Sequence, residues 1–422
     1  MKVLIAGATG FIGRHLVAGF AAAGHEIWCG SRNQRSGPRS CSRHVPLDYT
    51  QVSADTLTQT VTGCDLVINA VGLLQERGRQ TFDALHAAGP RTLFAACQAA
   101  GVPRVIQISA LGAGPHAESR YHRSKDAADQ FLMGMSLDWA ILQPSLVYGP
   151  GGTSARLFDL LATLPVTPLP AGGLQQVQPV FIDDLVEVAL ALAAHRGPLR
   201  CVLPVVGPDP LELRVFLAQL RETLGKTPAR TLALPGGLMR LVARVGDHTP
   251  GILLDSETWQ MLERGNIADA REVTRWLGRS PRAVRDFAPA DQQTMRRHHA
   301  ELLWLLPLLR ASVAAMWIVA AIVSLYPADT GLALLRSIGS PPALAPFLLG
   351  GAIAIDLALG MLTLSPRRPR WLWSAQIAVV VVYTVIISLM LPALWLEPFG
   401  PVAKNLPILA LLLLLQQLEK RP

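Results

Sequence analysis

The stretch Gly7-Ala8-Thr9-Gly10-Phe11-Ile12-Gly13 decides the fold of the front of this chain. An apolar run over residues 3–6 comes directly before it, and a helical pattern over residues 12–23 continues from it. A strand that enters a glycine turn and then a helix lets backbone amides approach a pyrophosphate, whose charge the helix N-terminus favours. The stretch therefore predicts a dinucleotide-binding turn. The residues expected against a nicotinamide cofactor here are Gly7, Thr9, Gly10, Phe11, Ile12 and Gly13.

Strand-like and helix-like segments alternate as far as about residue 150. The strand patterns cover residues 3–6, 26–30, 66–70, 105–109 and 139–143. This alternation predicts an α/β fold with a doubly wound parallel Rossmann sheet. From about residue 151 the pattern loosens into segments punctuated by proline and glycine, with helices near residues 183–194 and 211–224. We expect this part to form a substrate lobe.

The rear of the chain is apolar. The chain has 422 residues, of which 50% are hydrophobic and 16% are charged, and the apolar excess lies after about residue 302. Four apolar segments, at residues 305–326, 343–364, 371–394 and 402–418, predict an all-α domain of four transmembrane helices, the last of them short. We expect domains at residues 1–295 and 296–422, joined by a cationic linker over residues 286–299 on the bilayer surface.

Charge around the apolar segments predicts the orientation. The loop between the second and third segments carries Arg367, Arg368 and Arg370, whereas the preceding loop carries Arg336 beside Asp329. The arginine-rich loop is therefore expected in the cytoplasm, and both termini with it. No signal-peptide pattern precedes the first strand, which also favours a cytoplasmic front domain. We thus expect a multi-pass protein of the cytoplasmic (inner) membrane.

Net charge and cysteines exclude two other classes. The net charge is +8, but the arginines are dispersed and several flank apolar segments, which favours a lipid bilayer over nucleic acid as the partner. The chain has five cysteines, an odd number, with no C-x-x-C pair. We therefore expect reduced, unpaired thiols and no metal site. These cysteines are Cys29, Cys41, Cys64, Cys97 and Cys201.

Two further patterns concern cofactor choice and catalysis. Ser31 and Arg32 follow the second strand, and a cation there pairs with a 2′-phosphate, so NADP(H) is favoured over NAD(H). Arg35 or Arg39 is the alternative cation, and the alternative interpretation is that Arg32 simply lies in solvent.

In Tyr121-His122-Arg123-Ser124-Lys125, the first and last residues share a helix face, where the lysine is expected to lower the phenol pKa. Tyr121 is the expected proton donor, and an exposed pair without catalysis is the alternative.

The glycine spacing and the Y-x-x-x-K pattern together resemble the short-chain dehydrogenase/reductase superfamily, in particular its extended and atypical branches. The resemblance implies that Ser109 orients a substrate carbonyl and that Lys125 binds the nicotinamide ribose. It also implies that Asp48 lies next to the adenine. The backbone implied to lie under the cofactor is that of Ala70, Val71 and Gly72.

His86, Gly89 and Pro90, together with residues 143–150, resemble the branch that includes the nucleotide-binding accessory subunit of respiratory complex I. His86 stands where related enzymes have asparagine, so a proton relay through that asparagine is not expected.

The rear of the chain resembles the DoxX-like family, small four-span membrane proteins of which some are linked to quinone-dependent oxidation. The residues that carry this resemblance are Met316-Trp317-Ile318, Asp356 with Gly360, Tyr383-Thr384-Val385 and residues 398–407. Asp356 lies within an apolar segment, so we expect it to face the helix bundle as a functional site or a helix-orienting residue, paired with Arg310, Tyr383 or Lys404. Trp371, Trp373 and Trp395 are expected as membrane-interface anchors.

The leading hypothesis is a membrane-anchored NADP(H)-dependent oxidoreductase that reduces an apolar carbonyl or quinone-like substrate presented by the bilayer. The alternative is a non-catalytic NAD(P)H-binding scaffold or sensor that assembles with membrane subunits of a respiratory type. A cofactor-gated transporter is a third interpretation, which rests on Asp356 alone.

Overall fold

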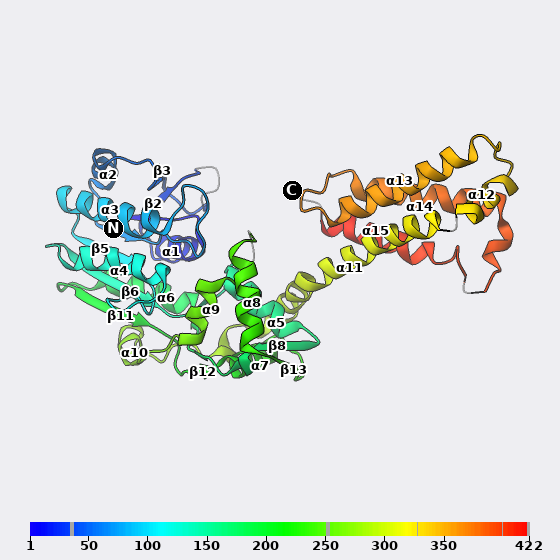
Figure 1. Ribbon diagram of the computed structural model, residues 1–422. Coiled ribbons are helices and arrows are strands. Elements are labelled where there is room, and N and C mark those ends of the chain that lie inside the picture. Colours follow the sequence, from blue (N-terminus) through cyan, green and yellow to red (C-terminus); the bar gives the residue numbers. More distant parts are fainter. Residues whose placement is uncertain (34–37, 250–253, 327, 399, 420–422) are drawn as a thin grey trace. The chain divides into compact units, whose positions relative to one another are not determined.

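The computed structural model describes residues 1–33, 38–249, 254–326, 328–398 and 400–419 (Figure 1). The chain divides into two compact units, Met1–Ala300 and Glu301–Pro422, and each is described by itself. Helix α11, Gln293–Leu325, runs without a break through residues 295 and 296. The helix shows no break at the domain boundary predicted between residues 295 and 296, and that boundary stays a prediction.

Among the described residues, the first unit contains a seven-stranded parallel sheet with the order β11-β6-β5-β4-β1-β2-β3. The order reverses between β1 and β4, and in such sheets ligands bind outside the carboxyl ends of the strands at that point. The strands are β1 (Lys2–Ala6), β2 (Glu26–Ser31), β3 (Arg43–Pro46), β4 (Leu66–Asn69), β5 (Arg104–Ile108), β6 (Asp138–Pro144) and β11 (Arg200–Val205).

Helices cover both faces of this sheet, because the inner strands are apolar on both sides (Figure 1). In β1, Val3 and Ile5 pack into one core with helices α1 and α6, while Leu4 packs into a second core with α2 and α3. These results confirm the predicted Rossmann fold. The helices of this part are α1 (Phe11–Ala22), α2 (Ala54–Val61), α3 (Gly89–Ala99), α4 (Arg120–Met133) and α6 (Ile182–Ala194).

The rest of the first unit forms smaller elements beside the carboxyl ends of the strands. Three two-stranded sheets pair β7 (Val147–Tyr148) with β10 (Val180–Phe181), β9 (Gln176–Val177) with β12 (Leu211–Glu212), and β8 (Val166–Pro170) with β13 (Arg230–Leu234). The helices are α5 (Thr153–Thr163), α7 (Leu213–Thr223), α8 (Gly236–Asp247), α9 (Ser256–Arg264) and α10 (Arg271–Leu277). Strands β3 and β11 lie in the main sheet and were not among the predicted strands. Both are edge strands, for which the apolar pattern is weak.

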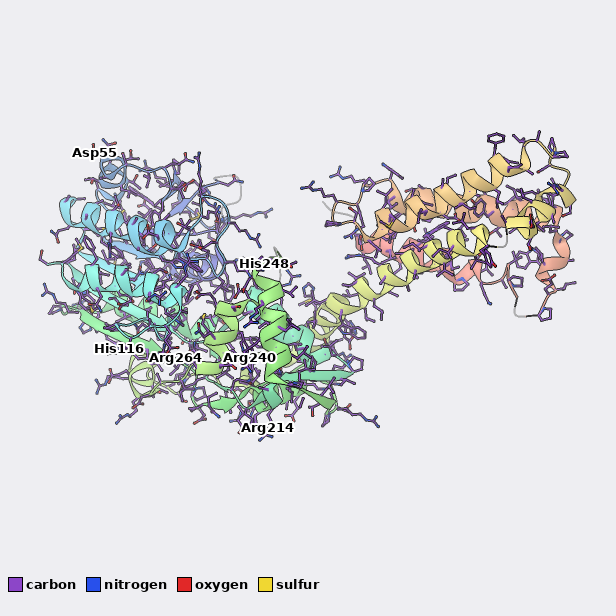
Figure 2. The ribbon with its side chains drawn as sticks, viewed as in Figure 1. Asp55, His116, Arg214, Arg240, His248 and Arg264 are labelled. Atoms are coloured by element: carbon purple, nitrogen blue, oxygen red, sulfur yellow. A yellow bond between two sulfur atoms is a disulfide. The ribbon has the colours of Figure 1, made fainter. Side chains whose placement is uncertain are left out.

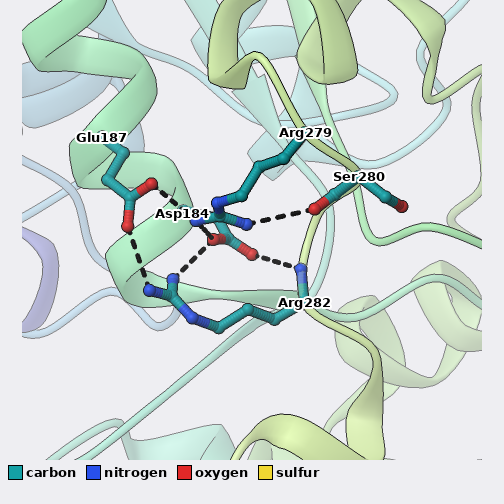
Figure 3. Close-up of polar contacts among 5 residues, drawn as sticks. All are labelled: Asp184, Glu187, Arg279, Ser280 and Arg282. Atoms are coloured by element: carbon teal, nitrogen blue, oxygen red, sulfur yellow. Dashed lines mark hydrogen bonds and ion pairs between the residues drawn. The ribbon is translucent and has the colours of Figure 1, made fainter.

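A charge cluster attaches the segment after α10 to helix α6 (Figure 3). The carboxylate of Asp184 is fully buried and accepts hydrogen bonds from Arg279 Nη2 at 2.7 Å and from the backbone N–H of Arg282 at 2.7 Å. Glu187 accepts from Arg279 Nη2 at 2.5 Å and from Arg282 Nη2 at 3.0 Å. Because the buried charge is fully paired, removal of one partner would leave an uncompensated carboxylate. This cluster is structural.

The second unit is helical. Beyond α11 it contains α12 (Ala328–Ser337), α13 (Ala345–Leu364), α14 (Leu372–Met390) and α15 (Asn405–Leu418). Among the described residues, α11, α13 and α14 are long and apolar enough to cross a membrane. All four predicted apolar segments are helical, but the 14 residues of α15 span about 21 Å, less than the ~30 Å of a hydrocarbon core. Helix α12 occupies part of a predicted loop.

Polar side chains link the helices of the second unit from within. Trp317 Nε1 donates to Gln376 Oε1 at 2.8 Å, and Gln376 Nε2 donates to Thr363 Oγ1 at 2.9 Å. A Cβ on Gly360 would lie 2.7 Å from Cγ1 of Ile318, so α11 and α13 pack closely there. Trp373 is buried in this bundle, so its prediction as an interface anchor is wrong, whereas Trp371 and Trp395 are exposed.

Asp356 is 7% exposed, and its Oδ1 has no hydrogen-bond partner among the described residues. Arg310, one of its three predicted partners, instead bonds to Glu419. Lys404 is exposed. The prediction that Asp356 faces the bundle agrees with its burial, while its pairing and role stay predictions.

Of two further predictions, the position of the 286–299 linker on the bilayer surface stays a prediction, and the absence of paired cysteines is wrong. The predicted surface linker ends in the first turns of α11, where Arg296 donates to Phe287 O at 2.8 Å and to Tyr148 Oη at 2.5 Å. Protein acceptors therefore hold this guanidinium, whereas His298 and His299 are exposed. Cys29 and Cys41 form a disulfide, because parallel pairing of β2 with β3 places their Cα atoms 5.9 Å apart. Cys64, Cys97 and Cys201 are free.

Candidate functional site

The glycine turn packs against the end of β4. Gly7 has φ +81°, and a Cβ on it would lie 2.8 Å from Ala70 O and 2.9 Å from Val71 N. A Cβ on Gly13 would lie 2.0 Å from Gly7 O, so the turn and the first helix can approach this closely only with glycine at both positions. Residues predicted from two separate motifs thus meet at one edge of the sheet.

Helix α1 begins at this turn with no side chain capping it. Its N-cap residue, Gly10, makes no side-chain hydrogen bond, and its first turn contains no acidic residue. Thr9 and Gly10 are exposed, while Phe11 and Ile12 are partly buried. An uncapped helix N-terminus at an exposed glycine turn fits a pyrophosphate, whose charge its free amides stabilise. These residues would hold the phosphates of a dinucleotide.

The predicted 2′-phosphate end lies beside β2. Ser31 is buried and donates to Asn33 O at 3.2 Å, whereas Arg32 and Arg39 are exposed. Arg35 lies outside the described residues. Asp48 Oδ1 accepts from the backbone N–H of Thr50 at 3.0 Å and from its hydroxyl at 2.8 Å. Asp48 therefore stabilises a local turn, and its contact with adenine stays a prediction.

Asn69 is the last residue of β4, and its fully buried side chain bonds to three other segments. Its Oδ1 accepts from Tyr49 Oη at 2.9 Å and from the Val71 amide at 3.2 Å, and its Nδ2 donates to Gln107 Oε1 at 2.7 Å. These bonds hold the 70–72 segment against the sheet. Gly72 is exposed, and a Cβ on it would lie 3.3 Å from Lys125 Nζ, so this segment reaches the predicted catalytic helix.

Lys125 is buried and connects two strand ends. Its Nζ donates to Ile108 O at 3.1 Å and to Val71 O at 3.3 Å. Burial lowers the pKa of Lys125 to about 8, although the carboxylate of Asp129 opposes the shift. The ammonium therefore lies between the 70–72 segment and Ser109, the next residue after Ile108.

Tyr121 lies one turn before Lys125 on the same face of α4. Its ring packs edge-on against Phe82 and His86, and its hydroxyl has no hydrogen-bond partner among the described residues. The predicted lowering of its pKa by Lys125 is wrong. Burial and the negative charge of Asp129 raise the pKa of Tyr121 to about 12, because both disfavour the phenolate.

Ser109 is buried and donates its hydroxyl hydrogen to Asp129 Oδ2. Burial raises the pKa of Asp129 to about 6, against the opposing effects of Ser109 and Lys125. Tyr121, Lys125 and Asp129 follow one another at intervals of four residues on one face of α4. Asp129 was missed by the sequence reasoning, although this spacing from Lys125 was visible.

His86 holds the segment after β4. Its Nε2 accepts from the Leu73 amide at 3.0 Å, and its Nδ1 lies 2.9 Å from Ser124 Oγ, which donates to Tyr121 O at 2.7 Å. Burial and the charge of Lys125 lower the pKa of His86 to about 2, so the ring is neutral. Because Nε2 is an acceptor, we place the proton on Nδ1. Both ring nitrogens are hydrogen-bonded, so His86 positions the backbone of Leu73 and, through Ser124, that of Tyr121.

Helix α9 contacts the start of α4. The Glu257 carboxylate accepts from the backbone N–H groups of Arg120 and Tyr121, at 3.2 and 3.4 Å. Asp255 accepts from Gln75 Nε2 at 3.0 Å. These acids lie more than 130 residues after Tyr121, and no local pattern pointed to them. They bring helix α9 next to the candidate catalytic tyrosine.

Comparisons with known proteins agree with this architecture. Residues 7–161 match the family described as NAD(P)H-binding, and residues 314–413 match the DoxX-like family. The fold, the site and the family match thus define a nicotinamide dinucleotide-binding domain of the Rossmann type. This chain joins that domain to a DoxX-like domain at its C-terminal end.

Curated relatives match part of the chain. Subunit 9 of the NADH dehydrogenase [ubiquinone] 1 alpha subcomplex of Arabidopsis thaliana is 29% identical over 253 residues, 57% of this chain and 62% of that protein. Ceramide reductase of Caulobacter vibrioides is 31% identical over 49% of this chain and 62% of that protein. The chain therefore covers about three fifths of these two relatives. The 4-hydroxy-2-methyl-3-oxo-4-farnesyl-3,4-dihydroquinoline-1-oxide ketoreductase of Stigmatella aurantiaca is 24% identical over 70% of this chain and 99% of its own length.

Solved structures share the fold. UDP-glucuronic acid 4-epimerase from Bacillus cereus in complex with NAD is 16% identical, with a TM-score of 0.54, covering 70% of this chain and 100% of that one. A nucleoside-diphosphate-sugar epimerase from Staphylococcus aureus is 16% identical, with a TM-score of 0.56, covering 68% and 99%.

Proposed function

We propose that this chain is a membrane-anchored, NADP(H)-dependent oxidoreductase that reduces an apolar carbonyl or quinone-like substrate. The observation that carries the proposal is the position of Tyr121, whose hydroxyl has no protein partner among the described residues. It lies one turn from a buried lysine that contacts the segment under the predicted cofactor site. Named reductases among the relatives support the class of reaction.

Each residue of the site has a proposed task. Tyr121 holds a proton at Oη, because its pKa of about 12 keeps the phenol neutral near pH 7, and donates it to the carbonyl oxygen of the substrate. Lys125 binds the nicotinamide ribose, and Ser109 orients the carbonyl once its hydroxyl hydrogen turns from Asp129 to the substrate oxygen. When bound, the nicotinamide supplies the hydride that completes the reduction.

Substrate class and cofactor rest on separate observations. Ceramide and a farnesyl-bearing quinoline oxide appear in the names of two relatives, and the second unit is apolar, which together favour a lipid-soluble substrate. Arg32 is exposed at the end of β2, where a guanidinium would pair with a 2′-phosphate. We further propose a multi-pass arrangement in the cytoplasmic membrane, with the front domain and the C-terminus in the cytoplasm.

The test uses detergent-purified full chain, titrated with NADPH and NADH and then supplied with quinone and lipid-aldehyde acceptors. We expect Tyr121→Phe to lower acceptor-dependent NADPH oxidation by about 10²-fold or more while NADPH still binds. Tyr326→Phe is the matched control, because Tyr326 is 86% exposed in the second unit. Equal turnover by wild type and Tyr121→Phe with every accepted substrate would contradict the proposal.

A scaffold is the second candidate. In the structure the Ser109 hydroxyl is bonded to Asp129 and not free for substrate, and subunit 9 of an NADH dehydrogenase [ubiquinone] subcomplex is among the relatives. Tight NADPH binding without oxidation in any variant, together with membrane subunits that co-purify, would favour this function over catalysis.

A further inference from the structure

Helix α8 has two separate apolar faces. Met239, Ala243 and Gly246 are buried, and the first two pack against Trp259 of α9. A second set faces away from this contact and is exposed. These residues are Leu238 at 45%, Leu241 at 57%, Val242 at 39% and Val245 at 55%. Their spacing of three, four and seven residues from Leu238 forms one continuous stripe on the helix. We call it the outer stripe.

The charges near the outer stripe are basic. Arg240 and Arg244 occupy the remaining side of the helix, and Figure 2 shows Arg240 and His248 along α8. Arg240 lies 3.7 Å from Glu263, but both side chains are more than 40% exposed, so this pair neutralises little. The acid of the helix, Asp247, accepts from the backbone N–H and the hydroxyl of Ser256 at 2.8 and 2.6 Å. Its charge is thus bound to the start of α9.

An apolar stripe bordered by arginines is the pattern of a helix that lies in a membrane interface, where acyl chains cover the stripe and anionic headgroups attract the cations. The same chain contains helices long and apolar enough to cross a membrane. When those helices are in a bilayer, the covalent link keeps the first unit near the membrane, so the effective concentration of lipid at α8 is high. These three features favour lipid as the occupant over a second copy of the chain, because an isologous contact would bring Arg240 and Arg244 toward their own copies.

We propose that α8 docks on the surface of an anionic bilayer, with Leu238, Leu241, Val242 and Val245 among the acyl chains. Arg240 and Arg244 lie at the phosphate headgroups. The inference goes beyond the reductase function and stands without it, since it rests on the outer stripe, its neighbouring arginines and the membrane-length helices.

Docking through α8 also has a consequence for the candidate site. The inner face of α8 packs on α9, and Glu257 of α9 bonds to the backbone of Arg120 and Tyr121. Helix α9 therefore connects the docked helix to the candidate catalytic tyrosine, through its packing on α8 and through the bond of Glu257 to the Tyr121 amide.

The test measures lipid contact directly in the full chain, reconstituted in nanodiscs with or without anionic phosphatidylglycerol. A fluorophore sensitive to polarity is attached at Val245→Cys or, as the control, at Val215→Cys, both in a Cys201→Ser background. Val215 is a valine of α7 that is 37% exposed, and the free thiols of Cys64 and Cys97 are buried. We expect blue-shifted emission and several-fold stronger quenching by nitroxide-labelled acyl chains at position 245. Both effects should weaken without anionic lipid.

Equal quenching at positions 245 and 215 would overturn the proposal. So would crosslinking between two copies through position 245 without quenching by lipid. A second pair of variants, Leu241→Glu and Val215→Glu, is then compared with the label at 245. We expect loss of quenching in Leu241→Glu alone. The comparison of the labels at 245 and 215 uses chains without a glutamate substitution, so it holds even if Leu241→Glu fails to fold. NADPH oxidation is not part of the readout, so failure here and failure of the reductase proposal are distinguishable.

Discussion

Ser109 donates its hydroxyl hydrogen to the carboxylate of Asp129, and both side chains are buried beside Lys125. Asp129 Oδ1 has no hydrogen-bond partner among the described residues. A carboxyl in this environment holds its proton more tightly than an exposed one, and its pKa is about 6. Asp129 therefore links the expected carbonyl-binding hydroxyl to the helix that carries Tyr121.

This arrangement predicts a pH-dependent stability. The folded-state pKa of Asp129, about 6, lies above the ordinary 3.8, so its favourable contribution is present below pH 3.8 and is lost as the pH rises through 6. Asp129→Asn should therefore gain stability relative to wild type between pH 4 and pH 7, by up to about 3 kcal/mol. Thermal unfolding of the full chain in detergent at both pH values measures this. Asp55→Asn, an exposed carboxyl-to-amide change, should give no such difference.

Lys125 predicts a second pH effect, on cofactor affinity. With a pKa of about 8, its ammonium is charged at pH 7 and mostly neutral at pH 9. We expect the Kd for NADPH to weaken by about tenfold over this range. In Lys125→Met the Kd should be weak and nearly independent of pH. Lys404→Met, a change at an exposed lysine of the second unit, should retain the wild-type profile. A wild-type Kd that stays constant up to pH 9 would contradict the role of Lys125.

Arg32 predicts the cofactor preference. Removal of a charge-assisted bond costs about 1.5–3 kcal/mol, so Arg32→Ala should weaken NADPH binding by roughly ten- to a hundredfold and leave NADH binding nearly unchanged. Fluorescence titration with both cofactors decides this. Arg39→Ala tests the described alternative, and Arg200→Ala is an exposed control on β11. Equal loss of NADPH and NADH affinity in Arg32→Ala would show that it does not read the 2′-phosphate.

The glycine turn predicts a steric effect on stability. A Cβ at position 13 would lie 2.0 Å from Gly7 O, whereas a Cβ on Gly114 would have nothing within 4 Å. Gly13→Ala should therefore destabilise the first unit by about 1–3 kcal/mol and abolish NADPH binding. Gly114→Ala should change stability by no more than about 0.5 kcal/mol. If Gly13→Ala binds NADPH like wild type, the close approach of turn and helix is not required.

Local patterns predicted much of the architecture. The glycine turn, the inner strands and the apolar rear segments all lie within short stretches, where periodicity reports directly on burial. The resemblance to the short-chain dehydrogenase/reductase superfamily implied a place beside the cofactor for residues 70–72 and for Lys125, and the structure brings both near the glycine turn. The family comparisons confirm the dinucleotide-binding front and the DoxX-like rear.

By itself, then, the sequence determined the two-part organisation, the Rossmann sheet and the residue types available for chemistry. Only the tertiary structure decided the Cys29–Cys41 bond, the burial of Trp373, the Ser109–Asp129 pair and the contact of Glu257 with the start of α4. It also reversed the expected pKa shift of Tyr121. The physical reason is common to all of these. Each depends on which distant segments pack together and how much water they exclude, and neither quantity is encoded in a local pattern.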